Sequence, residues 1–524
     1  GQAINFVTTG HFYLTPFNSA FNSNSFNWFH TTGANANFSS DYDYMQINNI
    51  TSLTGLTIGK YSGLLNGLTP VELVNSSYVM ISSAINVAGP ISVYGNRVDI
   101  NADIQTTQAN QAIKLVSKGV GTGNLTNGLV LLATNTDLTT NGGDIIVWSN
   151  AENSTTGQKN SEIILAGTNQ LTSNGGKIVL AGGLDDGANG GAAGDGIPDG
   201  YAYRGGYSGE AIDSRGDVSI NSDGGDIIIR GQQEATDYAI GLDDGTTINS
   251  GTGNIDIRAL NSGNHAMNLA SGNYAITSAS TDANAINISA STDGSNAGIV
   301  SSFNSGSSNA LIQTTSSSGG GITIQANNGG SGKGFWFGHN DASSTLQILS
   351  NVGNINLFTN AEMFVKNNTL FIGNRNSATA VQGVIPVAAN SSSDIVLKAN
   401  DFVFENTSEI NLNSSGTLTI EPFSSSFTDA QSLSTKFDLG NNFTGITYGK
   451  VGNTVNLTIP QALIVTGPIS VYGGNITVNG NLTSSDTTGV GINLISQINI
   501  LGQNSNITTN GADVLLSANS NNND

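Results

Sequence analysis

Short apolar segments that follow Gly-Gly corners recur in the first half of this chain. NGGDIIVWS (Asn141–Ser149), NGGKIVLAG (Asn174–Gly182) and DGGDIIIRG (Asp223–Gly231) repeat one arrangement of corner and strand. Glycine accepts the positive φ that a sharp corner needs, and asparagine tolerates it better than most residues. NIDIRA (Asn254–Ala259) and TVNLTI (Thr454–Ile459) place an apolar residue at every second position, which gives a strand one apolar face. The pattern predicts an all-β chain wound into successive coils.

A sandwich or barrel of short strands is the competing architecture for such a pattern. The pattern runs from about Ile81 to about Leu516 without a hydrophobic cluster large enough for a sandwich core. Helical spacing of apolar residues is almost absent, and only 10% of the 524 residues are charged. We therefore predict a β-solenoid, an elongated rod of stacked coils with about 22 residues in each coil.

A second, longer repeat spans several coils. GHFYLTPFNSAF, TGLTIGK and GPISVYG near the start match, in the same order, GTLTIEPFSSSF, TGITYGK and GPISVYG near the end. The offsets are 416 − 10 = 406, 449 − 59 = 390 and 467 − 89 = 378, and they fall steadily, as deletions in a copied module would cause. We predict one module copy over residues 1–110, continuous solenoid over 111–406, and a second, partial copy over 407–524.

The matched blocks resemble known proteins. LTIEPFSSSFT, FTGITYGK and TGPISVYGGNITVNGNLTSS look like segments of giant filamentous surface adhesins of Bacteroidota, which are similar in turn to filamentous-haemagglutinin-type β-helices. The resemblance covers the two module copies and reaches the middle segment only in style. It implies a right-handed parallel β-helix, export to the cell surface, and a role in attachment or gliding motility. It implies no catalytic residue, because the shared motifs are structural.

Charge and composition narrow the range of partners. Sixteen basic and 37 acidic residues give a net charge of −21, so the clustered Lys and Arg that bind phosphate backbones are missing. We expect neither nucleic acid nor an anionic membrane as a partner. The chain has no cysteine and no apolar run long enough to span a membrane, and we predict an extracellular protein.

The most distinctive polar cluster is the glycine-rich stretch GGLDDGANGGAAGDGIPDGYAYRGG (Gly182–Gly206), which interrupts the strand pattern. It holds four aspartates, namely Asp185, Asp186, Asp195 and Asp199. Ca²⁺ binds six to eight oxygens from carboxylates and carbonyls, and a glycine-rich loop can turn its carbonyls inward, so these residues predict a structural calcium site. The other interpretation is an acidic, solvated loop. The recurrence of LDDG at Leu242–Gly245 favours a turn motif.

A secreted β-helix that binds or cleaves polysaccharide is the alternative function. A glycosidase holds two carboxyl groups about 5–10 Å apart in a cleft. Asp185 and Asp186 are adjacent and lie among glycines, which hold side chains poorly. Arg230 and Arg258 are single charges on strands and are expected at the surface. We therefore predict that the chain is not an enzyme and has no catalytic residue.

Aromatic residues form two groups. GFWFG holds Phe335, Trp336 and Phe337 between glycines, and exposed rings at this position would stack on sugars, which predicts carbohydrate binding. The group between Phe17 and Tyr44 is expected to cover an open end of the solenoid or to pack a loop on it. The predicted partners are a surface polysaccharide, a host or substratum surface, and neighbouring modules of the same long chain.

Overall fold

A computed structural model of the chain describes residues 4–7, 9–14, 27–32, 35–39, 44–48, 53–59, 79–118, 128–151, 160–205, 209–234, 237–269, 273–301, 309–338, 344–373, 381, 391–434, 436–440, 442–503 and 505–518. Within them the secondary structure is all β, apart from one 3₁₀ turn at Ala188–Gly190. The chain forms two compact units, Gly1–Asn268 and Leu269–Asp524.

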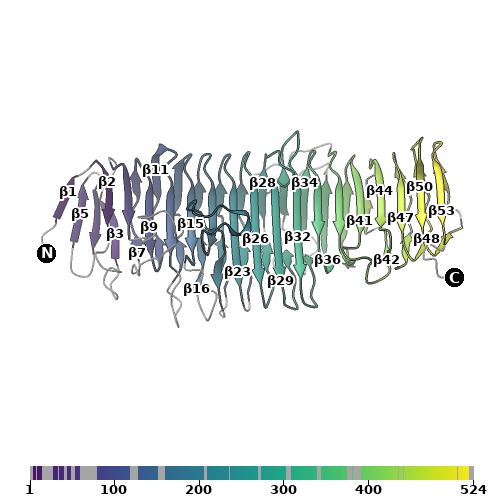
Figure 1. Cartoon of the computed structure of the whole chain (residues 1–524), viewed down its shortest axis with the longest axis horizontal. Helices are drawn as coiled ribbons and strands as arrows, with labels where there is room; N and C mark the ends of the chain where they lie inside the picture. Colours follow the sequence, from purple (N-terminus) through teal and green to yellow (C-terminus); the bar gives the residue numbers. More distant parts are fainter. Residues whose placement is uncertain are drawn as a thin grey trace. The chain divides into compact units, whose positions relative to one another are not determined.

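Both units are parallel β-solenoids, which confirms the predicted fold class. Each coil contributes three short strands, and each strand pairs in parallel with its counterpart in the next coil, so that three sheets form along the stack (Figure 1). One coil of the first unit illustrates the order: β10 (Val98–Ile100) lies in sheet 1, β11 (Ile104–Ala109) in sheet 2 and β12 (Ile113–Ser117) in sheet 3.

The strands of the first unit follow the same order. Sheet 1 also contains β3 (Asn27–Thr32), β7 (Val79–Ile81), β13 (Val130–Leu132), β17 (Ile163–Ala166), β21 (Ile212–Arg215) and β24 (Ile240–Leu242). Sheet 2 also contains β8 (Ile85–Val87), β14 (Asp137–Asn141), β18 (Gln170–Thr172), β22 (Ser219–Asn221) and β25 (Thr247–Asn249). Sheet 3 also contains β2 (His11–Leu14), β6 (Gly55–Ile58), β9 (Ile91–Gly95), β15 (Ile145–Ser149), β19 (Ile178–Gly182), β23 (Ile227–Gln233) and β26 (Ile255–Asn261), with the short strands β16 (Asn160–Ser161) and β20 (Ala202–Arg204) at its margin. Strand β27 (Met267–Leu269) crosses the division between the units.

The second unit also has three sheets, which are numbered in the same way. Sheet 1 holds β30 (Ile299–Ser301), β33 (Phe335–Phe337), β36 (Glu362–Lys366) and β39 (Asp401–Glu405). Sheet 2 holds β28 (Tyr274–Ser278), β31 (Asn309–Thr314), β34 (Ser344–Ser350), β37 (Asn368–Gly373), β40 (Glu409–Asn413) and β43 (Phe437–Leu439). Sheet 3 holds β29 (Ile286–Thr292), β32 (Ile322–Asn328), β35 (Ile355–Phe358), β38 (Ile395–Lys398), β41 (Thr417–Glu421), β44 (Gly445–Gly449), β47 (Ile469–Tyr472), β50 (Val490–Ile495) and β53 (Asp513–Ser517). In the last coils the other two sides are formed by β42 (Gln431–Ser432), β45 (Leu457–Ile459), β48 (Asn475–Val478) and β51 (Ile498–Leu501), and by β46 (Leu463–Val465), β49 (Leu482–Ser484) and β52 (Ile507–Thr509).

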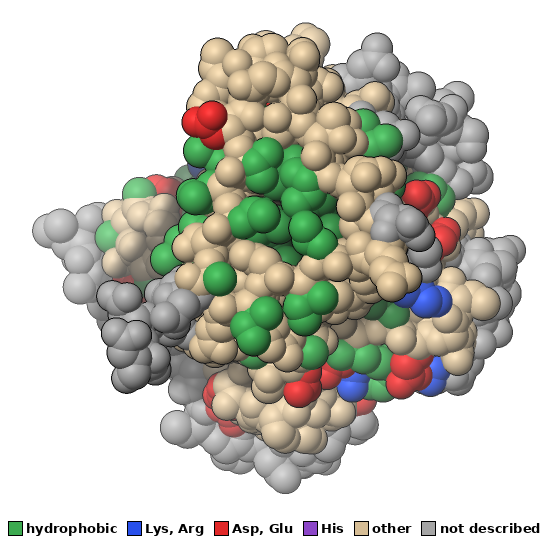
Figure 2. All heavy atoms as spheres, turned by 90° about the vertical axis from the view of Figure 1, so that its right-hand side faces the viewer, with side chains coloured by type: hydrophobic (Ala, Val, Ile, Leu, Met, Phe, Trp, Pro, Cys, Tyr) green, Lys and Arg blue, Asp and Glu red, His purple; other side chains and the backbone are tan. Residues whose placement is uncertain are grey.

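Columns of aliphatic side chains fill the inside of the coils. Ile113 pairs with Ile145, and Ile145 pairs with Ile178, and all three are completely buried. Because strand residues alternate between faces, the apolar member of each alternating pair points inward and stacks on its counterpart. Figure 2, which faces the end of the second unit, shows hydrophobic side chains gathered in the middle of that end with polar atoms around them.

The Gly-Gly corners are required by close packing between coils. A Cβ added at Gly176 would lie 2.2 Å from the carbonyl oxygen of Gly143, its counterpart in the preceding coil. At this corner, Asn174 and Gly175 have φ of 51° and 109°. Ser173 Oγ donates to the Gly176 carbonyl at 2.5 Å and lies 3.2 Å from the carbonyl of Ser222 in the next coil. The corners therefore combine a tight turn with hydrogen bonds between coils.

A second set of bonds links the coils in one direction. In many strands, Asp or Asn precedes the first inward-facing residue. The side-chain oxygen of this Asp or Asn accepts a hydrogen bond from the backbone N–H of the aligned residue in the next coil. Asp144 accepts from Lys177 at 2.8 Å, and Asp226 accepts from Asn254 at 3.0 Å. The same contact joins Asp103 to Asp137, Asp137 to Gln170, Asn273 to Asn309, Asp394 to Thr417, Asn456 to Asn475, and Asn481 to Asn506.

The predicted coil length is correct for only some of the coils. Ile91 pairs with Ile113, a step of 113 − 91 = 22 residues, whereas Ile178 pairs with Ile227, a step of 227 − 178 = 49 residues. The extra residues of the longer coil include the glycine-rich loop and the short strand β20, which lie outside the three strands of the coil and leave the stacked columns in register. Coil length is therefore not fixed by the core.

The longer sequence repeat corresponds to a structural repeat. In the first unit its three blocks form β2, β6 and β9, which are consecutive strands of sheet 3. In the second unit the matching blocks form β41, β44 and β47, again consecutive strands of sheet 3. The predicted module boundaries near residues 110 and 406 concern the sequence and remain predictions.

The start of the first unit departs from the parallel arrangement. Strands β3, β4 (Asn35–Ser39) and β5 (Tyr44–Asn48) pair antiparallel, β5 pairs in parallel with β1 (Ile4–Val7), and β3 pairs in parallel with β7. Of the aromatic group predicted to cover an end, Phe17, Phe21, Phe26 and Tyr42 lie outside the described residues. For Trp28, Phe29 and Tyr44 only the strands are described, so the prediction that these rings cover an end stays a prediction.

Candidate functional site

The glycine-rich loop after β19 lies over an apolar patch on the outside of sheet 3. Outward side chains of four consecutive strands form one buried cluster, and Ile197 of the loop and Ile228 of β23 pack against it. Strands β15 and β19 are therefore buried on both faces, which is why IIVWS and IVLAG are apolar nearly throughout. The cluster consists of Tyr94, Val116, Ile146, Trp148, Val179 and Ala181.

Two side chains of the sheet hold the loop over this cluster. Trp148 is 1% exposed, and its Nε1 donates to the carbonyl of Gly183 at 2.8 Å. Lys114 Nζ donates to the carbonyl of Gly196 at 2.6 Å and lies 4.7 Å from the centre of the Trp148 ring. Burial lowers the pKa of Lys114 to about 8, and the charges of Asp185 and Asp195 partly counteract that effect. Sequence reasoning missed both residues, although the continuous apolar strands were a signal for them.

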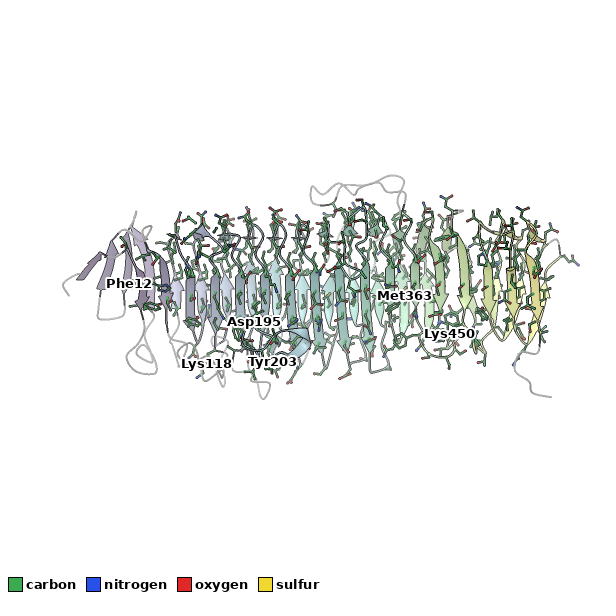
Figure 3. All side chains as sticks on the ribbon, turned by 45° about the horizontal axis from the view of Figure 1, so that its top comes forward. Phe12, Lys118, Asp195, Tyr203, Met363 and Lys450 are labelled. Atoms are coloured by element: carbon green, nitrogen blue, oxygen red, sulfur yellow. The ribbon has the colours of Figure 1, made fainter. Side chains whose placement is uncertain are left out.

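The four aspartates of the loop accept hydrogen bonds from the loop's own backbone. Asp185 accepts from the N–H groups of Gly194 and Gly196 at 2.6 and 2.7 Å, so it bridges two turns. Asp186 accepts from Ala188 at 3.0 Å, and Asp195 accepts from Ile197 at 2.8 Å. Figure 3 shows Asp195 in this loop, outside the strands of the first unit.

Asp199 is the most buried of the four, with 1% of its surface exposed. Its carboxylate accepts from the N–H of Gly187 at 2.6 Å. Burial raises the pKa of Asp199, an effect that the Gly187 hydrogen bond opposes. These contacts show a loop that is ordered by carboxylates binding backbone amides.

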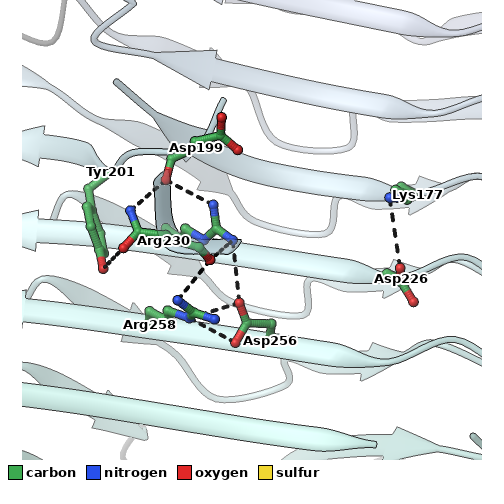
Figure 4. Close-up of polar contacts among 8 residues, drawn as sticks. Lys177, Asp199, Tyr201, Asp226, Arg230, Asp256 and Arg258 are labelled. Atoms are coloured by element: carbon green, nitrogen blue, oxygen red, sulfur yellow. Dashed lines mark hydrogen bonds and ion pairs between the residues drawn. The ribbon is translucent and has the colours of Figure 1, made fainter. Parts of the chain in front are cut away.

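A pair of arginines fixes the base of the loop (Figure 4). Arg230 donates to the carbonyl of Asp199 at 3.0 Å, and Arg258 donates to the carbonyl of Asn189 at 3.1 Å. Asp256 lies between the two guanidinium groups, 3.6 Å from Arg230 and 3.0 Å from Arg258. The prediction that both arginines are surface residues is wrong for Arg230, which is 4% exposed because the loop covers it.

These contacts bear on the two interpretations of the aspartates. Each carboxylate that was a candidate calcium ligand is engaged by one or two backbone N–H groups of the loop. Among the described residues, no group of three or more His, Cys, Asp or Glu side chains is arranged to hold a metal ion. The arrangement favours the acidic-loop interpretation, and calcium binding stays a prediction.

The recurrence of LDDG has a local explanation. In the first occurrence Gly187 has a φ of 81°, and in the second, at Leu242–Gly245, Gly245 has a φ of 91°. Both glycines take the left-handed conformation that favours glycine. The motif is therefore a turn signature, as expected from its recurrence.

The predicted aromatic platform is divided between the two faces of a strand. Phe335 and Phe337 of β33 are 0% and 1% exposed and point into the core, where their ring centres lie 5.1 Å apart. The prediction that all three rings bind sugar is therefore wrong for these two phenylalanines, because strand alternation sends only the central residue outward. Trp336 alone faces outward. Its ring packs edge-on against Phe364 at 5.8 Å, and Lys333 Nζ lies 5.2 Å from its centre.

A further set of charged residues surrounds Glu210 in the first unit. Burial, the largest cause, and the neighbouring charge of Asp213 raise the pKa of Glu210 to about 7. Arg215 pairs with Asp213 at 2.5 Å, and Arg204 pairs with Glu162. The arginines neutralise part of the acidic charge, so we interpret this set as a network that joins neighbouring turns.

No family model, curated protein or solved structure matches this chain. No helix in the described ranges is long and apolar enough to cross a membrane.

Proposed function

We propose that this chain is a non-enzymatic structural segment of an extracellular, repetitive bacterial surface adhesin. It serves attachment to a surface polysaccharide or a host or substratum surface, and gliding in cells that move on surfaces. The observation that carries the proposal is the module repeat, whose matched blocks form consecutive strands of sheet 3 in both units. Stacked repeats extend a surface without changing its design, which suits a filament.

The arrangement of polar groups supports the same proposal. The most distinctive acidic loop is bound to its own backbone, to Lys114 and to Arg230, and it covers an apolar patch. Such a loop contributes to the surface and stability of the coil, while a hydrolytic site needs carboxyl groups that face a substrate.

An attachment assay tests the proposal. Beads that carry the full chain are expected to stay attached under flow to surfaces coated with selected polysaccharides or host glycoproteins. Beads that carry an unrelated acidic protein of similar net charge provide the control. Equal loss of both bead types from every coating would contradict an adhesive role.

Polysaccharide binding is the second candidate function, and Trp336 is the observation that favours it. The indole is partly exposed on the outer face of β33, and the ammonium group of Lys333 lies 5.2 Å from its centre, so an apolar ring and a hydrogen-bond donor lie together in an arrangement that suits a sugar ring. Incubation with the same polysaccharides, followed by a reducing-sugar assay, separates binding from cleavage. Sustained release of reducing ends would show an enzyme and overturn the non-enzymatic proposal.

A further inference from the structure

One corner of the first unit carries the tripeptide Arg-Gly-Asp, within SRGD (Ser214–Asp217). This corner joins β21 of sheet 1 to β22 of sheet 2. Gly216 has a φ of 97°, a conformation that favours glycine. The N–H of Val218 donates to the carbonyl of Gly216 at 2.7 Å, so Asp217 lies at the centre of a three-residue γ-turn. The tripeptide therefore has a defined turn conformation.

Neighbouring coils hold this corner on both sides. Ser214 and Val218, which flank the tripeptide, are 1% and 0% exposed. The carbonyl of Arg215 accepts from the N–H of Gly167 in the preceding coil at 2.5 Å. The carbonyl of Val218 accepts from the N–H of Thr247 in the next coil at 2.8 Å. Because the backbone is already ordered, a partner that binds the corner would lose little free energy in fixing it.

The turn itself does not require the two charged residues. In the preceding coil Ala166 pairs with Arg215, and Gly167 and Thr168 follow it in the chain. Gly167 has a φ of 89°, and its carbonyl accepts from the N–H of Asn169 at 3.0 Å. The sequence Ala-Gly-Thr therefore forms the same kind of turn without a charge.

Both charged side chains of the corner reach the surface. The side chain of Arg215 is 55% exposed, and Asp217 is exposed. Arg215 contacts one oxygen of Asp213 through Nε and Nη2, both at 2.5 Å, and its Nη1 has no hydrogen-bond partner among the described residues. The carboxylate of Asp217 makes no hydrogen bond or ion pair within the described ranges. A Cβ at Gly245 would lie 1.8 Å from Asp217 Oδ1, so this glycine of the next coil leaves room for the carboxylate.

A guanidinium and a carboxylate separated by one residue indicate the chemistry of a partner. The outer edge of Arg215 suits a carboxylate in an acidic groove. The carboxylate of Asp217 suits a bound divalent cation, which prefers oxygen ligands. A neutral polysaccharide offers neither group. Arg-Gly-Asp is also a tripeptide that some adhesion receptors of animal cells read, so a protein receptor with a bound cation fits this corner better than a sugar does.

We propose that Arg215, Gly216 and Asp217 form a binding site for an adhesion receptor of animal cells that carries a divalent cation. An acidic groove of the receptor binds the guanidinium of Arg215, and its cation binds the carboxylate of Asp217. The site deepens the proposed attachment role and rests on it, because it assigns one host partner to one corner of the chain.

Attachment of cultured human fibroblasts tests this site. Wells are coated with equal amounts of the full chain or a variant, and the cells that remain after washing in medium with Mg²⁺ and Ca²⁺ are counted. D217E keeps the charge but moves the carboxylate by one methylene, and D217T copies Thr168 of the preceding coil. Both variants are expected to hold fewer cells by about tenfold or more, the loss typical of a binding hot spot. Excess EDTA is expected to release cells from the original chain.

D244E provides the matched control, because Asp244 is also an exposed aspartate and lies after β24 of the next coil. It is expected to hold as many cells as the original chain. All three variants are expected to keep the melting temperature of the original chain, so a loss of attachment does not reflect unfolding. A soluble Gly-Arg-Gly-Asp-Ser peptide is expected to release the cells, whereas Gly-Arg-Gly-Glu-Ser is expected to leave them attached.

Three results would overturn the receptor site. They are no attachment of fibroblasts to the original chain, equal attachment to D217E and the original chain, and attachment that EDTA and the Asp-containing peptide leave unchanged. In each case, beads that still hold to polysaccharide under flow would leave the general adhesive role intact. Loss of beads from every coating together with loss of fibroblast attachment would overturn both proposals.

Discussion

Replacement of Trp148 by alanine tests whether the acidic loop is held by the apolar patch beneath it. The indole is 1% exposed, packs in the outer cluster and donates to Gly183 at 2.8 Å. Truncating a buried Trp costs about 3–5 kcal/mol, and about 1 kcal/mol of that corresponds to a hydrogen bond. We therefore expect W148A to lower the unfolding free energy of the surrounding coils by about 3–5 kcal/mol, and W148F by much less.

The assay combines urea unfolding, followed by circular dichroism, with limited proteolysis of the loop. In a solenoid each coil depends mainly on its neighbours, so the loss is expected near β15 and in the glycine-rich loop. V451A provides the control, because Val451 is 78% exposed and its truncation is expected to change stability by less than about 0.5 kcal/mol. If W148A unfolds like the control and its loop resists protease as the wild type does, the cluster does not hold the loop.

Four further predictions follow from the contacts. G176A is expected to destabilise its coil by about 1–3 kcal/mol through overpacking, because the added Cβ would lie 2.2 Å from the Gly143 oxygen. A lower melting temperature of the variant would confirm this. The raised pKa of Glu210, about 7 against 4.5, means that its contribution to stability is fully present below about pH 4.5 and is lost as the pH rises through about 7. Between about pH 4.5 and pH 7, the melting temperature of E210Q should therefore fall less than that of the wild type. Parallel plots of melting temperature against pH for the two proteins would contradict this. W336A is expected to weaken any polysaccharide binding measured by affinity electrophoresis without changing the melting temperature by more than a few degrees. Isothermal titration with Ca²⁺ is expected to give no heat at the loop, and binding that is lost in D185N would establish the calcium prediction instead.

Much of the fold could be predicted because its determinants are local. The alternation in NIDIRA and the Gly-Gly corners at residues 142–143 and 175–176 depend on strand periodicity and corner geometry, which a few consecutive residues encode. The number of residues in a coil could not be predicted in this way. It depends on how much chain lies in turns outside the core, and the stacked columns place no limit on that length.

The candidate site was harder to predict because its contacts join distant parts of the chain. Arg230 does point outward, as its place between the inward residues Ile229 and Gly231 requires, but the loop that buries it comes from residues 183–201. For Phe335 and Phe337 the signal was available. In a strand, residues i and i+2 point to the same face, so both phenylalanines face the core and Trp336, between them, faces outward.

The variable coil length has a consequence for how such a chain can diversify. Steps of 22 and 49 residues keep the same inward columns in register, so an insertion between strands changes the outer surface and leaves the interior as it was. Mutation can therefore act on two nearly independent traits. The repeated columns set the interior, while the outer surface can be changed one turn at a time.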